Sequence, residues 1–327
     1  MIKKFALSTK LLAAGALMAF ASVTFAQQAF PNRPIRIIVP FAPGGGIDIV
    51  ARLVGQKLAE SFGQPVVVEN RPGGSTVIGT EALFKSPSDG YTLLAMSSSH
   101  VTNPHLIPKL PYDSLKDFSP VATLVNTEFV LALHPAVPAR NLPEFIALAK
   151  SKPDQLNYSS AGNASSPHIA GELFSITAGI KMQHVPYKGG APAVVDLIGG
   201  LVQLSLQPPI FVIAHINSGK LKGIAISGRS RFSGLPDVPT FAEAGLPDYE
   251  MNAWFGMLAP GGTPKAVIDK LSAEIARILL LPDMKQKLLA QGLEPFISTP
   301  DQFAALMNSD YEKYKKIIKT ANIKLDN

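Results

Sequence analysis

A strand, a glycine turn and a helix follow one another near the start of the chain. Residues 35–40 (IRIIVP) are a β-branched run typical of a buried strand, and the turn PGGGID follows shortly after it. Residues 47–62 then place apolar side chains about one helical turn apart, from Ile47 to Leu58. This alternation predicts an α/β fold, in which each strand leads through a short loop into a helix that covers the sheet.

The same alternation occupies most of the chain. Strand-like and helix-like segments alternate up to residue 96, begin again near residue 128 and continue to about residue 252. Two further helices are predicted at 265–281 and 301–318. Because a chain of 327 residues exceeds what one compact core usually organises, we expect two domains of similar plan.

The glycine turn has the composition of an anion-binding loop. Gly44, Gly45 and Gly46 carry no Cβ, so the backbone can adopt positive φ and approach a ligand closely. The helix that follows begins with unpaired N–H groups and about half a positive charge. A carboxylate or a phosphate is therefore the expected ligand. Asp48 in the first turn leaves two alternatives open: it favours the helix dipole, or it faces the ligand and organises a water or a polar group.

A second loop, further along the chain, repeats this plan. Residues 158–166 (YSSAGNASS) end a predicted strand and precede Pro167, which predicts Ser166 as the N-cap of a helix. One such loop is a weak signal. Two of them, at corresponding places in two α/β domains, predict a cleft that grips one ligand from both sides at the carboxyl ends of the strands.

The N-terminal residues have the order of a secretory signal peptide. Lysines at positions 3, 4 and 10 come before the apolar stretch 11–20 (LLAAGALMAF), and residues 24–26 (TFA) resemble a signal-peptidase site. We predict a signal peptide at 1–26, cleavage after Ala26 and export to the periplasm. A membrane anchor is the alternative, but the apolar stretch is short for a bilayer. The sequence contains no cysteine, which excludes disulfides and thiolate chemistry.

Removal of this segment changes the net charge. Loss of three lysines leaves 27 Lys+Arg (30 minus 3) against 24 Asp+Glu, which gives +3 in place of +6. No cluster of Lys or Arg suggests nucleic-acid binding, and none is predicted. A mild positive balance is compatible with an anionic ligand.

The motifs of several enzyme classes are incomplete or missing. Gly44, Gly46 and Glu69 resemble part of a dinucleotide-binding turn, but the third glycine is missing and Pro43 precedes the turn. An NAD-dependent oxidoreductase is therefore a disfavoured alternative. The sequence has no GxSxG, HExxH or Walker motif, and its six histidines are scattered. We predict a binding protein and not an enzyme, with no catalytic residues, no metal and no cofactor.

A resemblance to one family rests on five segments. These are PFAPGGGIDIVAR, VVVENRPGG, YSSAGNASSPHIAGELF, VPYKGGAPAVVDLIGG and WFGMLAPGGTP. Together they resemble the Bug-type periplasmic solute-binding proteins of tripartite tricarboxylate transport systems. The resemblance implies a two-domain Venus-flytrap fold, each domain a mixed sheet flanked by helices, with the ligand cleft between the domains. Domain 1 would comprise 27–127 and 254–327, and domain 2 would comprise 128–253.

The resemblance also implies where a ligand binds. In the family a carboxylate is held largely by backbone amides and ordered waters from the two strand-to-helix loops, and the polar run after the third strand lines the cleft. The corresponding residues here are Phe41, Gly44, Gly45, Gly46, Asp48, Ser97, Ser98, His100, Ser160, Ala161, Gly162, Asn163 and Gln207. Two positions depart from the family pattern. Ile47 makes the rim more apolar, and Gln207 replaces an acid that could pair with a ligand amine, which argues against amino-acid ligands.

The function implied by this resemblance is capture without bond-making. We expect a monomer that binds a small organic carboxylate, with di- and aromatic carboxylates included. It would deliver this ligand to the membrane permease subunits of a tripartite tricarboxylate transporter. A ligand sensor that presents its closed form to a signalling partner is the alternative. Trp254 and Phe255, near the second crossing between the domains, are expected in the core, with stacking on the ligand as the alternative.

Overall fold

The computed structural model describes residues 30–163 and 165–323. The signal peptide predicted at 1–26 lies outside these described residues and stays a prediction. Within the described part of the chain, no helix combines the length and the apolar character needed to cross a membrane.

The first sheet is mixed and has six strands. It contains β1 (Ile35–Val39), β2 (Val66–Asn70), β3 (Thr92–Ser97), β4 (Phe118–Glu128), β10 (Asn252–Pro260) and β11 (Glu294–Pro295). Their order is β11-β4-β10-β3-β1-β2. The neighbours β1, β2 and β3 run parallel, whereas β10 pairs antiparallel with both β3 and β4, and β11 pairs antiparallel with β4. The carboxyl ends of the three parallel strands therefore meet at one edge of the sheet.

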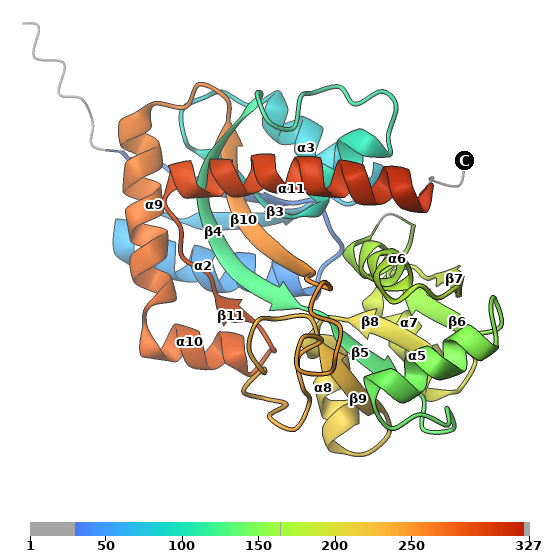
Figure 1. Cartoon of the computed structure of the whole chain (residues 1–327). Coiled ribbons are helices and arrows are strands. Elements are labelled where there is room, and N and C mark those ends of the chain that lie inside the picture. The colour runs from blue at the N-terminus through green and yellow to red at the C-terminus, as the bar shows by residue number, and fades with distance from the viewer. Residues whose placement is uncertain (1–29, 164, 324–327) are drawn as a thin grey trace, which may run out of the picture.

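The second sheet is also mixed and has five strands. It contains β5 (Val130–Leu133), β6 (Asn157–Ser160), β7 (Gln183–Pro186), β8 (Leu204–Gln207) and β9 (Lys222–Ile226). Their order is β7-β6-β8-β5-β9. Here β6 runs parallel to β7 and β8, and β5 runs antiparallel to β8 and β9. Figure 1 shows the two sheets with their flanking helices side by side. The predicted α/β fold with two mixed sheets is confirmed.

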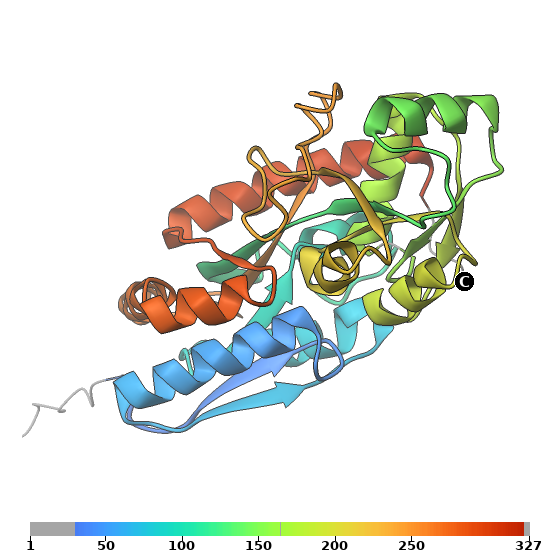
Figure 2. The ribbon, with the colours of Figure 1, turned by 90° about the horizontal axis from the view of Figure 1, so that it is seen from below.

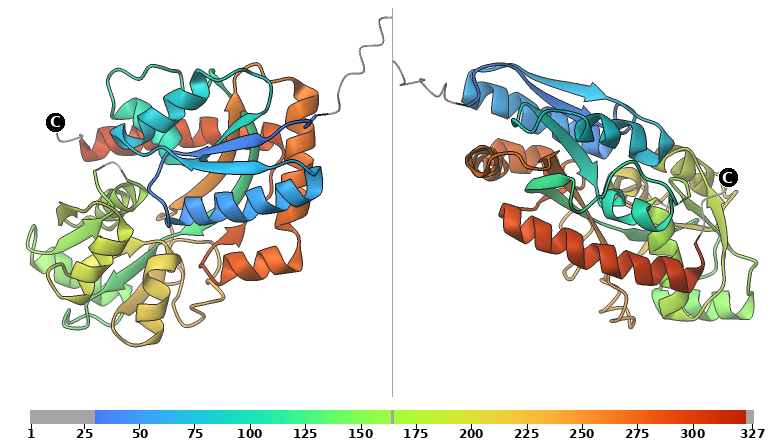
Figure 3. Two further views of the ribbon diagram at one scale, coloured as in Figure 1. Left: turned by 180° about the vertical axis from the view of Figure 1, so that it is seen from behind. Right: turned by 90° about the horizontal axis from the view of Figure 1, so that it is seen from above.

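Helices cover both faces of each sheet. On one face of the first sheet lie α2 (Gly46–Phe62), α9 (Lys265–Leu279) and α10 (Pro282–Leu289), and on the other lie α3 (Val77–Phe84), α4 (Ser99–Thr102) and α11 (Pro300–Ala321). Figures 2 and 3 show α2 and α11 on opposite sides of this sheet. The second sheet lies between the pair α5 (Leu142–Ser151) and α6 (Ser166–Ala178) and the pair α7 (Gly190–Ile198) and α8 (Pro209–Asn217). Short 3₁₀ turns occur at Gly74–Thr76 and Asn103–His105.

One apolar core runs through both halves of the molecule. On β5, Leu131 and Leu133 join the cluster that also contains Trp254 and Phe303 from the first half, whereas Val130 packs with α7 and α8. This alternation follows from the two-residue period of a strand, which turns successive side chains to opposite faces. The two halves therefore share part of their interior.

The chain crosses twice between the sheets, and one hydroxyl connects the two crossings. The first crossing joins β4 directly to β5 through Phe129, and the second leads from β9 to β10. The amide N–H of Phe129 donates to Ser227 Oγ (2.8 Å), and the Ser227 hydroxyl in turn donates to the carbonyl of Met251. Ser227 therefore fastens the outgoing and the returning segments to each other.

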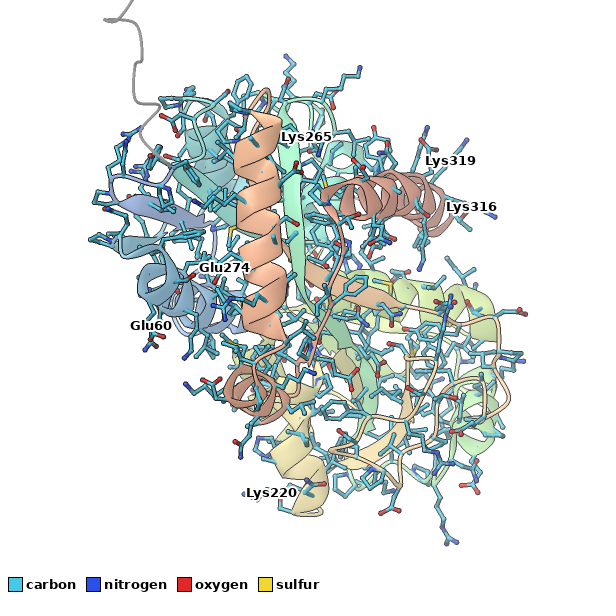
Figure 4. The ribbon with its side chains drawn as sticks, turned by 90° about the vertical axis from the view of Figure 1, so that its left-hand side faces the viewer. Glu60, Lys220, Lys265, Glu274, Lys316 and Lys319 are labelled. Carbon is cyan, nitrogen blue, oxygen red and sulfur yellow. The ribbon has the colours of Figure 1, made fainter. Side chains whose placement is uncertain are left out.

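The last part of the chain departs from the prediction in its helix boundaries. The predicted helix 265–281 ends at Leu279, and α10, which the sequence did not predict, starts at Pro282. The predicted helix 301–318 is longer, because a capping box at Thr299 begins α11 one residue earlier and the helix continues to Ala321. Figure 4 shows the polar faces of these helices: Lys265 on α9 and Lys316 and Lys319 on α11 point outward, whereas Glu274 lies on the side of α9 that faces α2.

Candidate functional site

The first candidate loop joins β1 to α2 and leaves the start of that helix uncapped. Gly44 has φ of +84°, a left-handed conformation that favours glycine. Gly45 is the N-cap residue and has no side chain that could accept from the first N–H groups of α2. The amide of Ile49 is the first to bond within the helix, to the carbonyl of Gly45 (3.0 Å). The amides that precede it are therefore directed at the loop, as in anion-binding helix starts.

An aromatic ring limits the space for a side chain at position 46. A Cβ at this position would be 3.3 Å from Cε2 of Phe255, on β10. Phe255 is half-buried, and Trp254 beside it is fully buried and donates from Nε1 to Asp310 Oδ2 (2.8 Å). Trp254 is thus a core residue, and the ring of Phe255 borders the glycine loop.

Asp48 braces the first loop from inside. Its side chain is buried, and Oδ2 accepts from the amide of Gly44 (2.9 Å) and from Nε of Arg52 (3.1 Å), while Oδ1 accepts from Nδ2 of Asn70 (2.9 Å). Burial alone would raise the pKa of Asp48, but the hydrogen bonds from Arg52, Gly44 and Asn70 outweigh it and lower the pKa. The carboxylate fixes the glycine backbone in place, a role that the sequence did not suggest, and it still lies in the first turn of α2, where a negative charge favours the helix dipole.

Arg52 and Asn70 complete the brace, and the sequence analysis missed both. Asn70 Nδ2 also donates to the carbonyl of Phe41 (3.1 Å), and Arg52 Nη2 donates to Asn70 Oδ1 (2.7 Å). Arg52 could have been found, because it lies four residues after Asp48 on the same helix face. Asn70 reaches the loop because β1 and β2 pair in parallel, with Val39 opposite Asn70 at the ends of the two strands. This pairing joins distant segments and gives no local signal in the sequence.

The serines after β3 link the two halves. The amide of Ser98 donates to the carbonyl of Trp254 (3.0 Å), and Ser97 Oγ lies 2.7 Å from Ser99 Oγ. Ser98 Oγ lies 3.5 Å from Ser166 Oγ, at the start of α6 in the other half. Ser98 is therefore placed at the contact between the halves, Ser97 contacts Ser99 within the first half, and a binding role for both stays a prediction.

His100 does not join these serines. Its ring is 1% exposed, with Nε2 2.9 Å from the carbonyl of Ser114 and an edge contact to Phe118 at 4.8 Å between ring centroids. Burial lowers the pKa of His100 to about 4, and the bond to Ser114 only partly opposes this. The expectation of a cleft-lining histidine is corrected here: the short helix α4 turns the side chain away from Ser98 into the core.

This buried histidine predicts a loss of stability in acid. The folded pKa lies below the ordinary value of 6.5, so between these values the unfolded chain binds a proton that the native ring does not. The stabilisation is complete above pH 6.5 and is lost as pH falls toward 4. We expect the contribution of His100 to reduce the free energy of unfolding by about 2 kcal/mol when the pH is lowered from 7 to 5. Urea unfolding of the parent and of His100→Gln at both pH values measures this difference. An equal change in the free energy of unfolding between pH 7 and pH 5 in the two proteins would contradict it.

The second candidate loop joins β6 to α6. Ser160 is fully buried, and its Oγ accepts from the amide of Gly162 (3.1 Å) and lies 2.7 Å from Nε2 of His184. Gly162 has φ of +125°, while Ala161, Gly162 and Asn163 are half-buried. The N-cap of α6 is Ser165 and not the predicted Ser166, because Ser165 Oγ accepts from the amide of His168 (3.4 Å).

A cavity of about 370 Å³ lies beside this loop and takes its walls from both halves. One wall is Asn163, His168, Glu172, His184 and Pro186, and the other is the end of α11 at residues 321–323. The rings of His168 and His184 stack at 3.7 Å between centroids. Burial lowers the pKa of His168 to about 3, which favours the neutral imidazole, and burial raises the pKa of Glu172 while the hydrogen bond from Tyr158 opposes that shift.

Gln207 ends β8 and is fully buried. Its Nε2 donates to Ser205 Oγ (3.1 Å), whereas its Oε1 is a buried acceptor that no donor from the described residues reaches. Across residues 30–163 and 165–323, no group of three His, Asp or Glu side chains is arranged to hold a metal ion. At the two loops the structure presents backbone amides and serine hydroxyls that can form hydrogen bonds.

Comparison with known proteins identifies the family of this chain. A family model described as the tripartite tricarboxylate transporter family receptor matches residues 50–323. The chain belongs to this receptor family. Protein BugT of Bordetella pertussis is 38% identical over 322 residues, which cover 97% of this chain and 99% of that protein. The predicted Bug-type resemblance is confirmed.

Solved structures show the same fold. R. palustris Rpa4515, solved with adipate, is 32% identical, with a TM-score of 0.83 over 91% of this chain and 100% of that one. MatC from Rhodopseudomonas palustris, solved with malate, is also 32% identical, with a TM-score of 0.78 over 88% of this chain and 100% of that one. This receptor has the two-domain Venus-flytrap fold of periplasmic binding proteins, and its family and fold are those of solute-binding receptors and not of enzymes.

Proposed function

We propose that this receptor captures a small organic carboxylate between its two domains in the periplasm and delivers it to the permease subunits of a tripartite tricarboxylate transporter. The observation that supports this most is the uncapped start of α2, whose glycine loop Asp48 holds rigid. Relatives that bind adipate and malate support the ligand class. We further propose that domain 1 comprises 27–127 and 254–327, and that domain 2 comprises 128–253.

In this proposal the ligand carboxylate accepts from the amides of Gly45 and Gly46 and from the loop at Ser160–Asn163. Each hydrogen bond to a charged group contributes about 1.5–3 kcal/mol, and closure of the domains removes the ligand from water. Gln207 Oε1 is a neutral acceptor that can accept from a hydroxyl on the ligand, but it carries no charge to pair with an ammonium group.

A thermal-shift panel tests the ligand class. A bound carboxylate at about 100 times its Kd stabilises the folded protein by about 2.7 kcal/mol. The panel holds adipate, malate, citrate and benzoate, with adipamide as a control that has the length of adipate but no carboxylate. We expect at least one carboxylate to raise the Tm by several degrees while adipamide does not. No shift with any carboxylate, or an equal shift with adipamide, would contradict the proposal.

A further inference from the structure

Glu128 places a carboxyl group at the first crossing between the sheets. It is the last residue of β4, and β5 of the second sheet begins at Val130. Its Oε1 occupies the space that a Cβ at position 228 would need, so only glycine fits there. Gly228 lies at the start of the second crossing, next to Ser227, so the carboxyl group is enclosed by backbone from both crossings.

The surroundings of Glu128 oppose a negative charge. Glu294 on β11 pairs with Asn126, which shares the strand face of Glu128, so the two carboxyl groups lie on one side of the sheet. The neighbouring side chains of Asn126, Pro209 and Phe232 are neutral. The basic side chain next to Gly228, Arg229, is engaged with Glu250 (3.0 Å). Burial, and then the charge of Glu294, raise the pKa of Glu128 to about 7.

Two oxygens at this position lack a donor. Among the residues that the structure describes, Glu128 Oε2 and Asn252 Oδ1 are buried acceptors without a hydrogen-bond partner. Asn252 stands directly opposite Glu128 in the pairing of β10 with β4, so the two side chains share a face. A proton on Glu128 supplies the donor that an acceptor pair of this kind needs, whereas an ionised carboxylate leaves both oxygens unsatisfied.

The cavity next to Glu128 is formed by residues of both halves, so its size depends on how the two halves are oriented relative to each other. This cavity has a volume of about 10 Å³, which is room for about one water. Asn126, Gly292 and Glu294 from the first half form one side, and Pro209 and Phe232 from the second half form the other. A Cβ on Gly292 would be 2.8 Å from Pro209 Cβ, so these halves are in close contact here. Rotation of the halves apart opens this cavity to water and lowers the cost of ionising Glu128.

We propose that Glu128 is a proton-binding site coupled to closure, so that the receptor takes up a proton when it closes on its carboxylate ligand. The proposal rests on the proposed function, because the ligand is what stabilises the closed form. The sign follows from linkage: the closed form has the higher pKa and is favoured at low pH. Ligand affinity is therefore highest below pH 6 and falls as pH rises through about 7.

Calorimetric titration with adipate and with malate at pH 6 and pH 8 tests this coupling. We expect the affinity of the parent receptor to fall by up to about 10-fold between these values. Titration at pH 7 in phosphate and in Tris, which differ in ionisation enthalpy, should show uptake of a fraction of a proton. In Glu128→Gln the uptake should disappear and the affinity should be nearly equal at both pH values. Comparison on the same ligand cancels the titration of the ligand itself.

Two further variants separate this site from a general effect of charge. Glu294→Gln removes the neighbouring charge and should shift the midpoint of the affinity loss to lower pH. Asp248→Asn removes an exposed carboxylate in the second crossing without releasing Arg229 from Glu250, and it should behave like the parent. Binding with equal affinity at pH 6 and pH 8, or pH dependence that persists in Glu128→Gln, would overturn this role for Glu128 alone. Failure of adipate, malate, citrate and benzoate alike to bind at either pH would overturn the coupling together with the proposed function.

Discussion

Replacing Asp48 by alanine is expected to weaken ligand binding by about 100-fold, which corresponds to about 2.7 kcal/mol. The substitution leaves the amides of Gly44 and Asn70 without their acceptor and releases Arg52. The glycine loop then loses the contact that holds its backbone in the left-handed turn. We also expect the free energy of unfolding to fall by about 2–3 kcal/mol. This is less than for a fully buried pair, because Arg52 is half exposed and can be hydrated.

Variants at two positions show whether ligand affinity depends on the hydrogen bonds that Asp48 accepts or on its ion pair with Arg52. Asp48→Asn keeps the size of the side chain but presents an amide to donors, and it should lose most of the affinity. Arg52→Gln removes only the exposed partner and should cost less than about 1 kcal/mol. Affinity is measured by calorimetry with the carboxylate that the thermal-shift panel selects, and stability by urea unfolding. If Asp48→Ala keeps parent affinity, the loop does not depend on this carboxylate.

Replacing Gly171 by alanine is expected to lower the free energy of unfolding by about 3 kcal/mol. The added methyl would overlap the ring edge of Tyr158, with Cζ 2.8 Å away, and Tyr158 is among the largest fully buried side chains. Tyr158 cannot move aside easily, since its hydroxyl donates to Glu172 Oε1 (2.5 Å). Helix α6 must therefore shift on the sheet, and the candidate loop at its start shifts with it, so ligand affinity should fall as well.

A double variant tests whether the overlap with Tyr158 is the cause. Tyr158→Leu makes room beside position 171, so adding Gly171→Ala to it should cost much less than Gly171→Ala costs in the parent. Ile176→Ala, on the exposed side of the same helix, controls for changes in helix propensity and should cost under about 1 kcal/mol. Additive losses in the double variant would show that Tyr158 is not what Gly171 accommodates.

The fold was largely predictable from the sequence because its signals are local. The β-branched run before PGGGID and the helical spacing after it sufficed for β1 and α2. The order of strands in each sheet depends on pairing between distant segments, and it was not predicted; the resemblance implied only that each sheet is mixed. Helix α10 was missed because half of its eight residues, PDMKQKLL, are polar and only Met284 and Leu288 are buried, which leaves a weak apolar pattern.

The candidate site was less predictable, because its side chains are directed by tertiary contacts. Asp48 was singled out for its place in the first turn, but its inward orientation depends on Asn70, which arrives through the pairing of β1 with β2. His100 follows three serines in sequence and looked like part of one polar group. The partners of His100, Ser114 and Phe118, follow α4 in the sequence, and no local pattern predicts that they enclose the histidine ring.

The hydroxyl of Ser227 has a mechanical consequence. Two separate connectors would allow the halves to slide, twist and swing independently of one another. Because Phe129 and Met251 both bond to one side chain, we expect the connectors to move together about a single axis. Motion between the halves would then reduce to opening and shutting, and the proposed binding loops at Gly44–Gly46 and Ser160–Asn163 would return to the same register at each closure.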